Sequence, residues 1–289
     1  MVDAGDGVRL FARVHRSPAP SAQTMLLLHG FTGTSDSWGS LAAILARHLD
    51  VIVVDLPGHG RSSAPSDPAR YALDRLADDL AAVVDAGGAR AVVALGYSMG
   101  GRAAVKFALR HPGRVAGLVL ESTSPGITDT AQRARRRQSD DDLATMLERD
   151  GITAFVEVWE RLPLWSSQVA LDQRTRNRLR MQRLAQSPQA LANALRGAGQ
   201  GSDAPVAGEL HAIRVPVLLI AGALDDAYVA FGRTMASALP DARLEIVPGA
   251  GHAVHLERPA EYASLVNRFL ASNSFNPPSD LAGIEQEME

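Results

Sequence analysis

The pentapeptide GYSMG at residues 96–100 contains the residue types of a reactive serine. The pattern G-x-S-x-G is typical of a nucleophile elbow, a sharp turn between a strand and a helix that presents the serine hydroxyl at its tip. An apolar run at 91–95 precedes the pentapeptide and an amphipathic run at 101–110 follows it, so the sequence supplies both flanking elements. No G-x-G-x-x-G accompanies it, which disfavours a nucleotide-binding turn. We therefore expect Ser98 to be catalytic.

A reactive serine needs a base that accepts its proton. Among the eight histidines, His252 lies just after the apolar run 244–247, in the segment GAGHA. Residues that follow parallel strands gather at the carboxyl edge of an open sheet, where ligands bind. We therefore expect His252 to be the base. Ordinary structural roles suffice for three other histidines: His59, His111 and His255.

The base in turn needs a carboxylate that orients it. Asp225 follows the apolar run 217–221 and gives the chain order Ser, Asp, His, which is one of the orders in which such triads occur. Asp226 and Glu121 remain alternatives, Glu121 because it ends another apolar run on the same edge. We expect Asp225 to be the third member.

The segment HGFTG at 29–33 follows the apolar run 25–28. In an elbow of this kind, a backbone N–H from such a loop pairs with the N–H of the residue after the serine to form an oxyanion hole. The two groups here would be those of Phe31 and Met99. An ordinary glycine-rich turn is the alternative, and the serine elbow downstream favours the oxyanion hole.

Seven apolar runs recur along the chain, several of them apolar throughout, as expected for strands covered on both faces. They lie at 8–14, 25–28, 51–55, 91–95, 115–120, 217–221 and 244–247. Amphipathic helical patterns lie between them, at 41–49, 73–86, 101–110 and 228–239. This alternation predicts an α/β fold with a mostly parallel, doubly wound sheet.

The alternation breaks between about residues 126 and 204, where only helical patterns occur, at 128–149, 152–161, 172–186 and 188–196. Such a stretch is typical of a helical lid inserted into an α/β core. We expect core segments at 1–127 and 205–272 on either side of a lid at 128–204, followed by a disordered acidic tail at 273–289.

Composition narrows the class of protein. A chain of 289 residues with 46% hydrophobic residues builds its own core, and the absence of cysteine excludes a disulfide scaffold, a Cys-ligated metal and a thiol nucleophile. The net charge of −3 argues against nucleic acid as a partner. The sequence shows no signal peptide and no apolar run long enough to span a membrane, so we expect a cytoplasmic protein.

Residues 8–271 resemble the α/β-hydrolase superfamily, and within it the chain is similar to the 2-succinyl-6-hydroxy-2,4-cyclohexadiene-1-carboxylate (SHCHC) synthases, the lyases of menaquinone biosynthesis. The segments GYSMGGRAA (96–104) and LANALRGAGQGS (191–202) are the most specific, and the second lies in the predicted lid, where unrelated hydrolases diverge. Three further segments match: LLLHGFTGTSDSW (26–38), VLESTSPG (119–126) and PGAGHAVHLERP (248–259).

The resemblance implies elimination of pyruvate from a small tricarboxylate, 2-succinyl-5-enolpyruvyl-6-hydroxy-3-cyclohexene-1-carboxylate, without a metal or organic cofactor. Ser98, activated by His252, would act as the base, and the N–H groups of Phe31 and Met99 would hold the dienolate oxygen. The family's carboxylate-binding arginines and pocket aromatics match five positions: Arg102, Arg136, Arg183, Tyr97 and Trp159. The neighbouring arginines 133, 135 and 137 match none and are assigned to a solvated helix face.

A serine hydrolase on the same fold, either a carboxylesterase or a carbon–carbon-bond hydrolase, is the main alternative to the synthase. A non-catalytic ligand receptor is a more remote one, because such a receptor has less reason to keep every triad member. The lid arginines favour the synthase, since ordinary esters call for an apolar lid. The sequence leaves the oligomeric state open.

Overall fold

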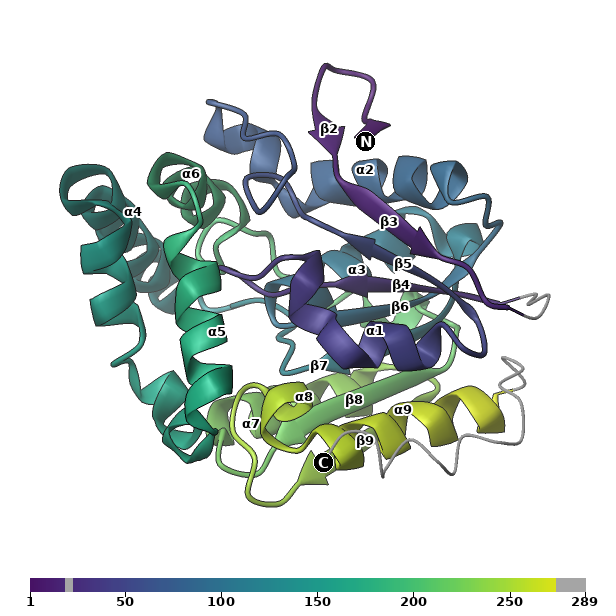
Figure 1. Ribbon diagram of the computed structural model, residues 1–289. Helices are drawn as coiled ribbons and strands as arrows, with labels where there is room; N and C mark the ends of the chain where they lie inside the picture. Colours follow the sequence, from purple (N-terminus) through teal and green to yellow (C-terminus); the bar gives the residue numbers. More distant parts are fainter. Residues whose placement is uncertain (19–22, 274–289) are drawn as a thin grey trace.

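The computed structural model describes residues 1–18 and 23–273, so most of the expected tail at 273–289 lies outside the described residues. A seven-stranded sheet forms the centre of the molecule, in the order β3-β5-β4-β6-β7-β8-β9 (Figure 1). Its strands are β3 (Ala12–His15), β4 (Thr24–Leu28), β5 (Asp50–Val54), β6 (Val92–Tyr97), β7 (Val115–Glu121), β8 (Val217–Gly222) and β9 (Ala242–Val247). Neighbouring strands run parallel except β3, which pairs antiparallel with β5 at one edge. The predicted α/β fold with a mostly parallel sheet is confirmed.

Alternate side chains of each strand enter two different apolar layers. In β4, Leu26 and Leu28 join one cluster, while Met25 and Leu27 join the other. The first layer packs under α2 (Leu73–Ala86), α3 (Met99–Arg110) and α7 (Asp226–Ala238). The second packs under α1 (Gly39–Leu45), α8 (Val254–Glu257) and α9 (Pro259–Ser272). Helices therefore cover both faces, which explains why the central strands are apolar throughout.

The single strand predicted at 8–14 is wrong in one respect, because the chain forms two short strands there. β2 (Arg9–Leu10) pairs with β1 (Val2–Asp3) in a separate sheet, and β3 begins only at Ala12. Between them, the N–H of Phe11 donates to Ser62 Oγ at 2.8 Å. Serine hydroxyl oxygens in the loop after β5 thus accept hydrogen bonds from backbone N–H groups that a continuous strand would have paired within one sheet.

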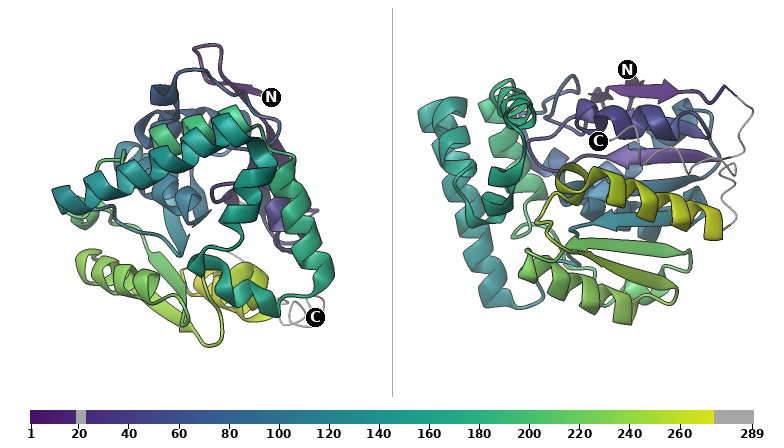
Figure 2. Two further views of the ribbon diagram at one scale, coloured as in Figure 1. Left: turned by 90° about the vertical axis from the view of Figure 1, so that its left-hand side faces the viewer. Right: turned by 60° about the horizontal axis from the view of Figure 1, so that its bottom comes forward.

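The chain between β7 and β8 begins with four helical elements that form an insertion: α4 (Thr130–Trp159), the 3₁₀ helix η4 (Pro163–Ala170), α5 (Gln173–Leu184) and α6 (Pro188–Ala198). They stand together at the carboxyl ends of the parallel strands (Figure 2). They share a small apolar cluster of their own, which includes Leu147, Phe155, Trp159 and Leu191. Four shorter 3₁₀ helices lie in the core: η1 (Ser35–Trp38), η2 (Pro68–Tyr71), η3 (Pro112–Arg114) and η5 (Leu210–Ala212).

The longest inserted helix contains a break that the sequence indicated. Separate helices were expected at 128–149 and 152–161, and the structure joins them as α4 across a kink at Gly151, whose φ is +78°. That backbone conformation costs glycine little and strains other residues. No helix in the described part of the chain is long and apolar enough to cross a membrane.

Candidate active site

Ser98 lies at a strained turn between β6 and α3. Its φ of +53° and ψ of −109° are unusual for a residue with a side chain, and such strain is often found at functional sites. The turn is possible because its glycines let backbones touch. A Cβ at Gly100 would lie 2.2 Å from the carbonyl oxygen of Leu28, and one at Gly96 would lie 2.4 Å from that of Gly100. The structure therefore contains the elbow that G-x-S-x-G predicts.

His252 lies between Ser98 and Asp225. Its Nε2 is 3.1 Å from Ser98 Oγ, and its Nδ1 is 2.7 Å from Asp225 Oδ2. The loops after β8 and β9 carry Asp225 and His252, and the side chains of both are almost fully buried. With Nδ1–H donated to the carboxylate, Nε2 of the neutral imidazole is left as an acceptor for the serine proton. This arrangement can make the serine oxygen nucleophilic or basic.

The other two candidate acids lie elsewhere. Glu121 is fully buried, and its Oε1 accepts from the backbone N–H of His255 at 3.0 Å and lies 2.9 Å from its Nδ1. Asp226 is exposed at the start of α7. Among the three carboxylates that the sequence left open, Asp225 is therefore the one that contacts His252.

The backbones of Phe31 and Met99 lie beside the serine. Met99 is the first residue of α3, and the N–H groups in the first turn of a helix have no intrahelical acceptor. The loop of Phe31 packs directly on the elbow, since a Cβ at Gly30 would come within 2.7 Å of the Tyr97 ring. Both residues line the same cavity as Ser98. Their positions suit an oxyanion hole.

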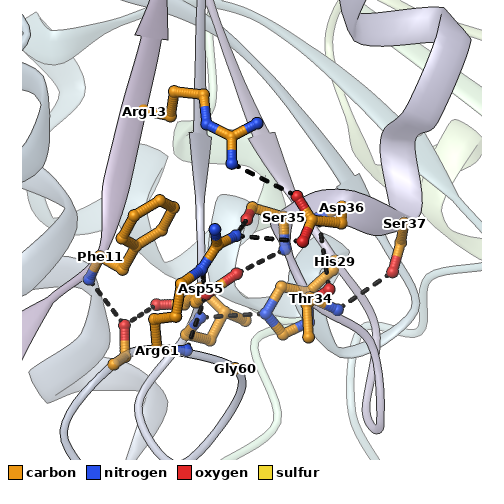
Figure 3. A network of polar contacts seen from close by, with 12 residues as sticks. Phe11, Arg13, His29, Thr34, Ser35, Asp36, Ser37, Asp55, Gly60 and Arg61 are labelled. Carbon is orange, nitrogen blue, oxygen red and sulfur yellow. Dashed lines mark hydrogen bonds and ion pairs between the residues drawn. The ribbon is translucent and has the colours of Figure 1, made fainter. Parts of the chain in front are cut away.

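A polar network fixes the loop that carries Phe31 to the loop after β5 (Figure 3). Asp55 is fully buried, and its carboxylate accepts from the N–H groups of Ser35 at 2.6 Å and Arg61 at 2.9 Å. Burial opposes ionisation, but the hydrogen bonds from Ser35 and Arg61 hold the pKa of Asp55 below its usual value. His29 Nε2 accepts from the N–H of Leu56 at 3.0 Å. The candidate oxyanion loop is therefore tied down on two sides.

Because His59 is buried in this region, we expect the fold to lose stability in acid. Burial, together with the nearby His29, lowers the pKa of His59 to about 3. At pH values below about 6.5, His59 becomes protonated in the unfolded chain but stays neutral in the folded chain. The free energy of unfolding is therefore highest above about pH 6.5. Protonation of His59 in the unfolded chain should lower it by about 2 kcal/mol between pH 6.5 and pH 5.

Urea unfolding at several pH values measures this slope. His59→Gln should flatten it, while His211→Gln, at an exposed position, should leave it unchanged. Parallel slopes for wild type and His59→Gln would show that His59 is not the group responsible.

Ser98 and His252 open into a cavity of about 780 Å³, including its mouth, between the sheet edge and the inserted helices. Its apolar walls include Phe31, Trp159, Leu164, Trp165 and Leu195. Its polar lining includes Tyr97, Arg102, Arg136, Asp140, Gln200 and Tyr228. An apolar pocket with a few fixed charges is typical of a site for a small organic molecule.

Two of the three predicted arginines reach this cavity. Arg102 is 7% exposed and is held by Asp203, whose Oδ2 lies 3.3 Å from its Nη1, and by the carbonyl oxygen of Ala198. Burial, opposed by Asp203, lowers the pKa of the Arg102 guanidinium. Arg136 donates through Nε to Asp140 at 2.8 Å, and its two terminal amino groups make no other ion pair or hydrogen bond within the described residues. Arg136 is thus better placed than Arg102 to donate hydrogen bonds from both terminal amino groups to a bound anion.

Arg183 lies outside the cavity that Ser98 lines. Its Nη1 pairs with Glu160 at 2.9 Å, and its guanidinium lies 5.5 Å from the centre of the Trp165 ring. Trp165 also contacts His252 edge to face, with ring centres 5.4 Å apart. The Trp165 ring therefore contacts both Arg183 and the imidazole. Arg183 lines a separate small cavity that shares Phe31, Tyr97 and Trp165 with the first.

Sequence reasoning missed several residues at the site. Asp140 could have been found from its spacing, because it lies four residues after Arg136 on one helix. Tyr228 packs edge-on against His252 with ring centres 4.5 Å apart, and its hydroxyl accepts from Gln200 Nε2 at 2.8 Å. No local pattern indicates that pair, because Gln200 and Tyr228 come from different elements. In the described parts of the chain, no group of three or more potential ligands is arranged to hold a metal ion.

Comparisons with known proteins show the fold and the family of this chain. Residues 23–259 match the family described as alpha/beta hydrolase fold. A Bacillus subtilis (strain 168) protein provisionally named 2-succinyl-6-hydroxy-2,4-cyclohexadiene-1-carboxylate synthase is 42% identical over 271 residues, which is 94% of this chain and 98% of that protein. The structure of MenH from S. aureus is 33% identical with a TM-score of 0.88, and the match covers 91% of this chain and 98% of that one.

An enol-lactonase from Burkholderia xenovorans LB400 is similar at 26% identity and a TM-score of 0.79, over 94% of this chain and all of that one (100%). The fold and the family match place the chain in the α/β-hydrolase superfamily. Within that superfamily, it belongs to the family of the SHCHC synthases.

Proposed function

We propose that this protein is an SHCHC synthase, which eliminates pyruvate from 2-succinyl-5-enolpyruvyl-6-hydroxy-3-cyclohexene-1-carboxylate. The observation that carries the proposal is one cavity in which Ser98 and His252 face two arginines, Arg102 and Arg136. An acid–base pair beside fixed cations suits a substrate that must lose a proton while carrying several carboxylates. Family membership supports the same activity.

The triad supplies the base. Ser98 Oγ removes the ring proton next to the succinyl ketone and passes its own proton to Nε2 of His252, while Asp225 stabilises the imidazolium. The electron pair of the broken C–H bond moves onto the ketone oxygen, where the N–H groups of Phe31 and Met99 donate to it. When the ketone re-forms, the C–O bond to the enolpyruvyl group breaks. The departing enolpyruvate takes up the proton that the His252 imidazolium releases and becomes pyruvate, which returns the triad to its starting protonation state.

The arginines hold the carboxylates. Arg136 offers two terminal amino groups in the fork geometry that binds a carboxylate through two hydrogen bonds. Arg102 supplies a second, buried positive charge. Trp159 and Tyr97 line the cavity beside the ring of the substrate. Arg183 binds a further carboxylate from the neighbouring cavity, which shares Phe31, Tyr97 and Trp165 with the cavity of the serine.

The inserted helices act as the lid of this site. The proposed lid spans residues 128–204, between core segments 1–127 and 205–272. Support comes from Arg136, Trp159, Trp165 and Gln200, which belong to this segment and line the cavity that contains Ser98. A lid of this kind excludes water and strengthens the charge–charge contacts inside.

The reaction itself provides the direct test. Purified protein given the enolpyruvyl substrate should release pyruvate and form the conjugated diene in equal amounts, recorded by a coupled lactate dehydrogenase assay and by ultraviolet absorbance. Boiled protein is the control for spontaneous elimination. Pyruvate release without the diene, or neither product, would contradict the proposal.

A serine hydrolase of the same fold is the second candidate, favoured by the structural similarity to an enol-lactonase. It would use the same triad to form an acyl-enzyme with an ester or lactone. Rapid turnover of small neutral esters, together with inactivity on the enolpyruvyl substrate, would support this candidate instead.

A further inference from the structure

The loop that carries His252 is held by a carboxylate outside the triad. Glu257 is the last residue of the short helix α8 and is only 8% exposed. Its Oε2 accepts from the N–H of Gly251 at 2.7 Å, and its Oε1 accepts from the N–H of Ala253 at 3.2 Å. These are the backbone N–H groups of the two residues that flank His252. One side chain therefore binds the loop on both sides of the imidazole.

The loop has little room to shift. A Cβ at Gly251 would lie 2.1 Å from Oγ of Ser167 in the inserted helix η4, and a Cβ at Gly222, where β8 ends, would lie 2.1 Å from the carbonyl oxygen of Gly251. The loop is thus packed between the sheet and the inserted helices. Glu257 supplies the hydrogen-bond acceptors that the buried N–H groups at this point require.

Besides the aromatic rings that pack on it, two carboxylates help to position the imidazole. Asp225 fixes the rotation of the ring through Nδ1. Glu257 instead fixes the backbone from which the ring projects. Because Nε2 is 3.1 Å from Ser98 Oγ, a small displacement of the loop lengthens that hydrogen bond beyond its useful range.

We propose that Glu257 is a positioning residue that keeps His252 within hydrogen-bond reach of Ser98. It touches neither the serine nor the cavity and acts through the backbone of the loop. The inference rests on the proposed chemistry of Ser98 and His252. Serine reactivity can, however, be measured without the proposed substrate.

Three variants separate positioning from mere folding. E257Q keeps the size of the side chain but replaces one acceptor oxygen with an NH₂ group that faces an N–H donor. E257A removes both acceptors. E261Q makes the same acid-to-amide change at an exposed position at the start of α9 and serves as the matched control. Thermal unfolding of each variant sets an assay temperature at which all are folded.

Two rates are compared at that temperature. One is kcat for pyruvate elimination, and the other is the rate at which a small neutral fluorophosphonate modifies Ser98, which needs the imidazole but not the substrate. E257Q should lower both by about tenfold to a hundredfold, since misplacing a reacting group by about 1 Å costs that much. KM should stay nearly constant, E257A should be slower still, and E261Q should match wild type.

The outcomes are distinguishable from those of the proposed function. Wild-type rates in E257Q would overturn the inference, and so would a raised KM with both kcat and phosphonylation unchanged. If wild type shows no synthase activity but E257Q still slows phosphonylation, the proposed function fails and the positioning role stands. If the synthase is active and E257Q changes neither rate, the reverse holds.

Discussion

Ser98→Ala and His252→Ala should each lower kcat for pyruvate elimination by roughly 10³-fold or more while the protein stays folded. The serine oxygen is a weak base on its own. Its competence depends on the 3.1 Å contact with His252 Nε2 and on the 2.7 Å contact that orients the imidazole. Removal of either partner therefore disables the same proton transfer.

The double variant is the sharper test. Residues that act as a unit give losses that do not add, so Ser98→Ala combined with His252→Ala should be within about threefold of the worse single variant. Single-turnover kinetics measures all three, and His211→Gln, an exposed histidine, is the control for nonspecific effects. A double variant whose loss equals the product of the two single losses would mean that the serine and histidine work independently.

The sequence predicts most of the fold because the signals are local. Strands such as β4, β6 and β8 are short apolar runs covered on both faces, and their pattern depends on burial alone. The elbow combines a strand, two glycines and a helix in one continuous stretch, residues 92–110, so its turn is also visible locally. The helical insertion is visible because strand patterns stop between β7 and β8.

What the sequence does not reveal is set by contacts between distant segments. The break between β2 and β3 depends on Ser62, a loop residue 51 positions after Phe11. Arg102 forms its ion pair with Asp203, which lies 101 positions away in the chain. Trp165 contacts both Arg183 and His252 only after the inserted helices pack on the sheet, and Arg183 then lines a separate cavity. The resemblance to the SHCHC synthases identified these arginines, but it could not say which of them share the cavity of the serine.

The arginines give the second large effect and separate a synthase from a hydrolase. Loss of a charge-assisted contact to a carboxylate costs on the order of 1.5–3 kcal/mol, or roughly tenfold to a hundredfold. Arg102→Ala and Arg136→Ala should each lower kcat/KM for the tricarboxylate by that much, and the double variant by more than about a hundredfold. Arg136→Lys should rescue only partly, because lysine cannot form the two-pronged contact.

Stability distinguishes the two positions. The side chains of Arg102 and Asp203 are 7% and 8% exposed, and breaking a buried pair by removing one partner costs about 3 kcal/mol or more. Lys106, 3.7 Å from Asp203, offsets part of that loss. The side chain of Arg136 is 42% exposed, so Arg136→Ala should destabilise less. Arg135→Ala, next to it on the exposed surface of α4, should change neither stability nor kcat/KM.

Comparing a neutral ester with the tricarboxylate shows whether the arginines bind substrate or only stabilise the fold. A neutral ester, if it is hydrolysed at all, offers no carboxylate, so its turnover should be nearly the same in wild type, Arg102→Ala and Arg136→Ala. Equal losses on ester and tricarboxylate would make the arginines structural and favour the hydrolase. Arg183→Ala adds a test of the lid. A loss of about tenfold or more on the tricarboxylate alone would mean that Arg183 contacts a substrate carboxylate, whereas full activity would mean that Arg183 serves only its ion pair with Glu160.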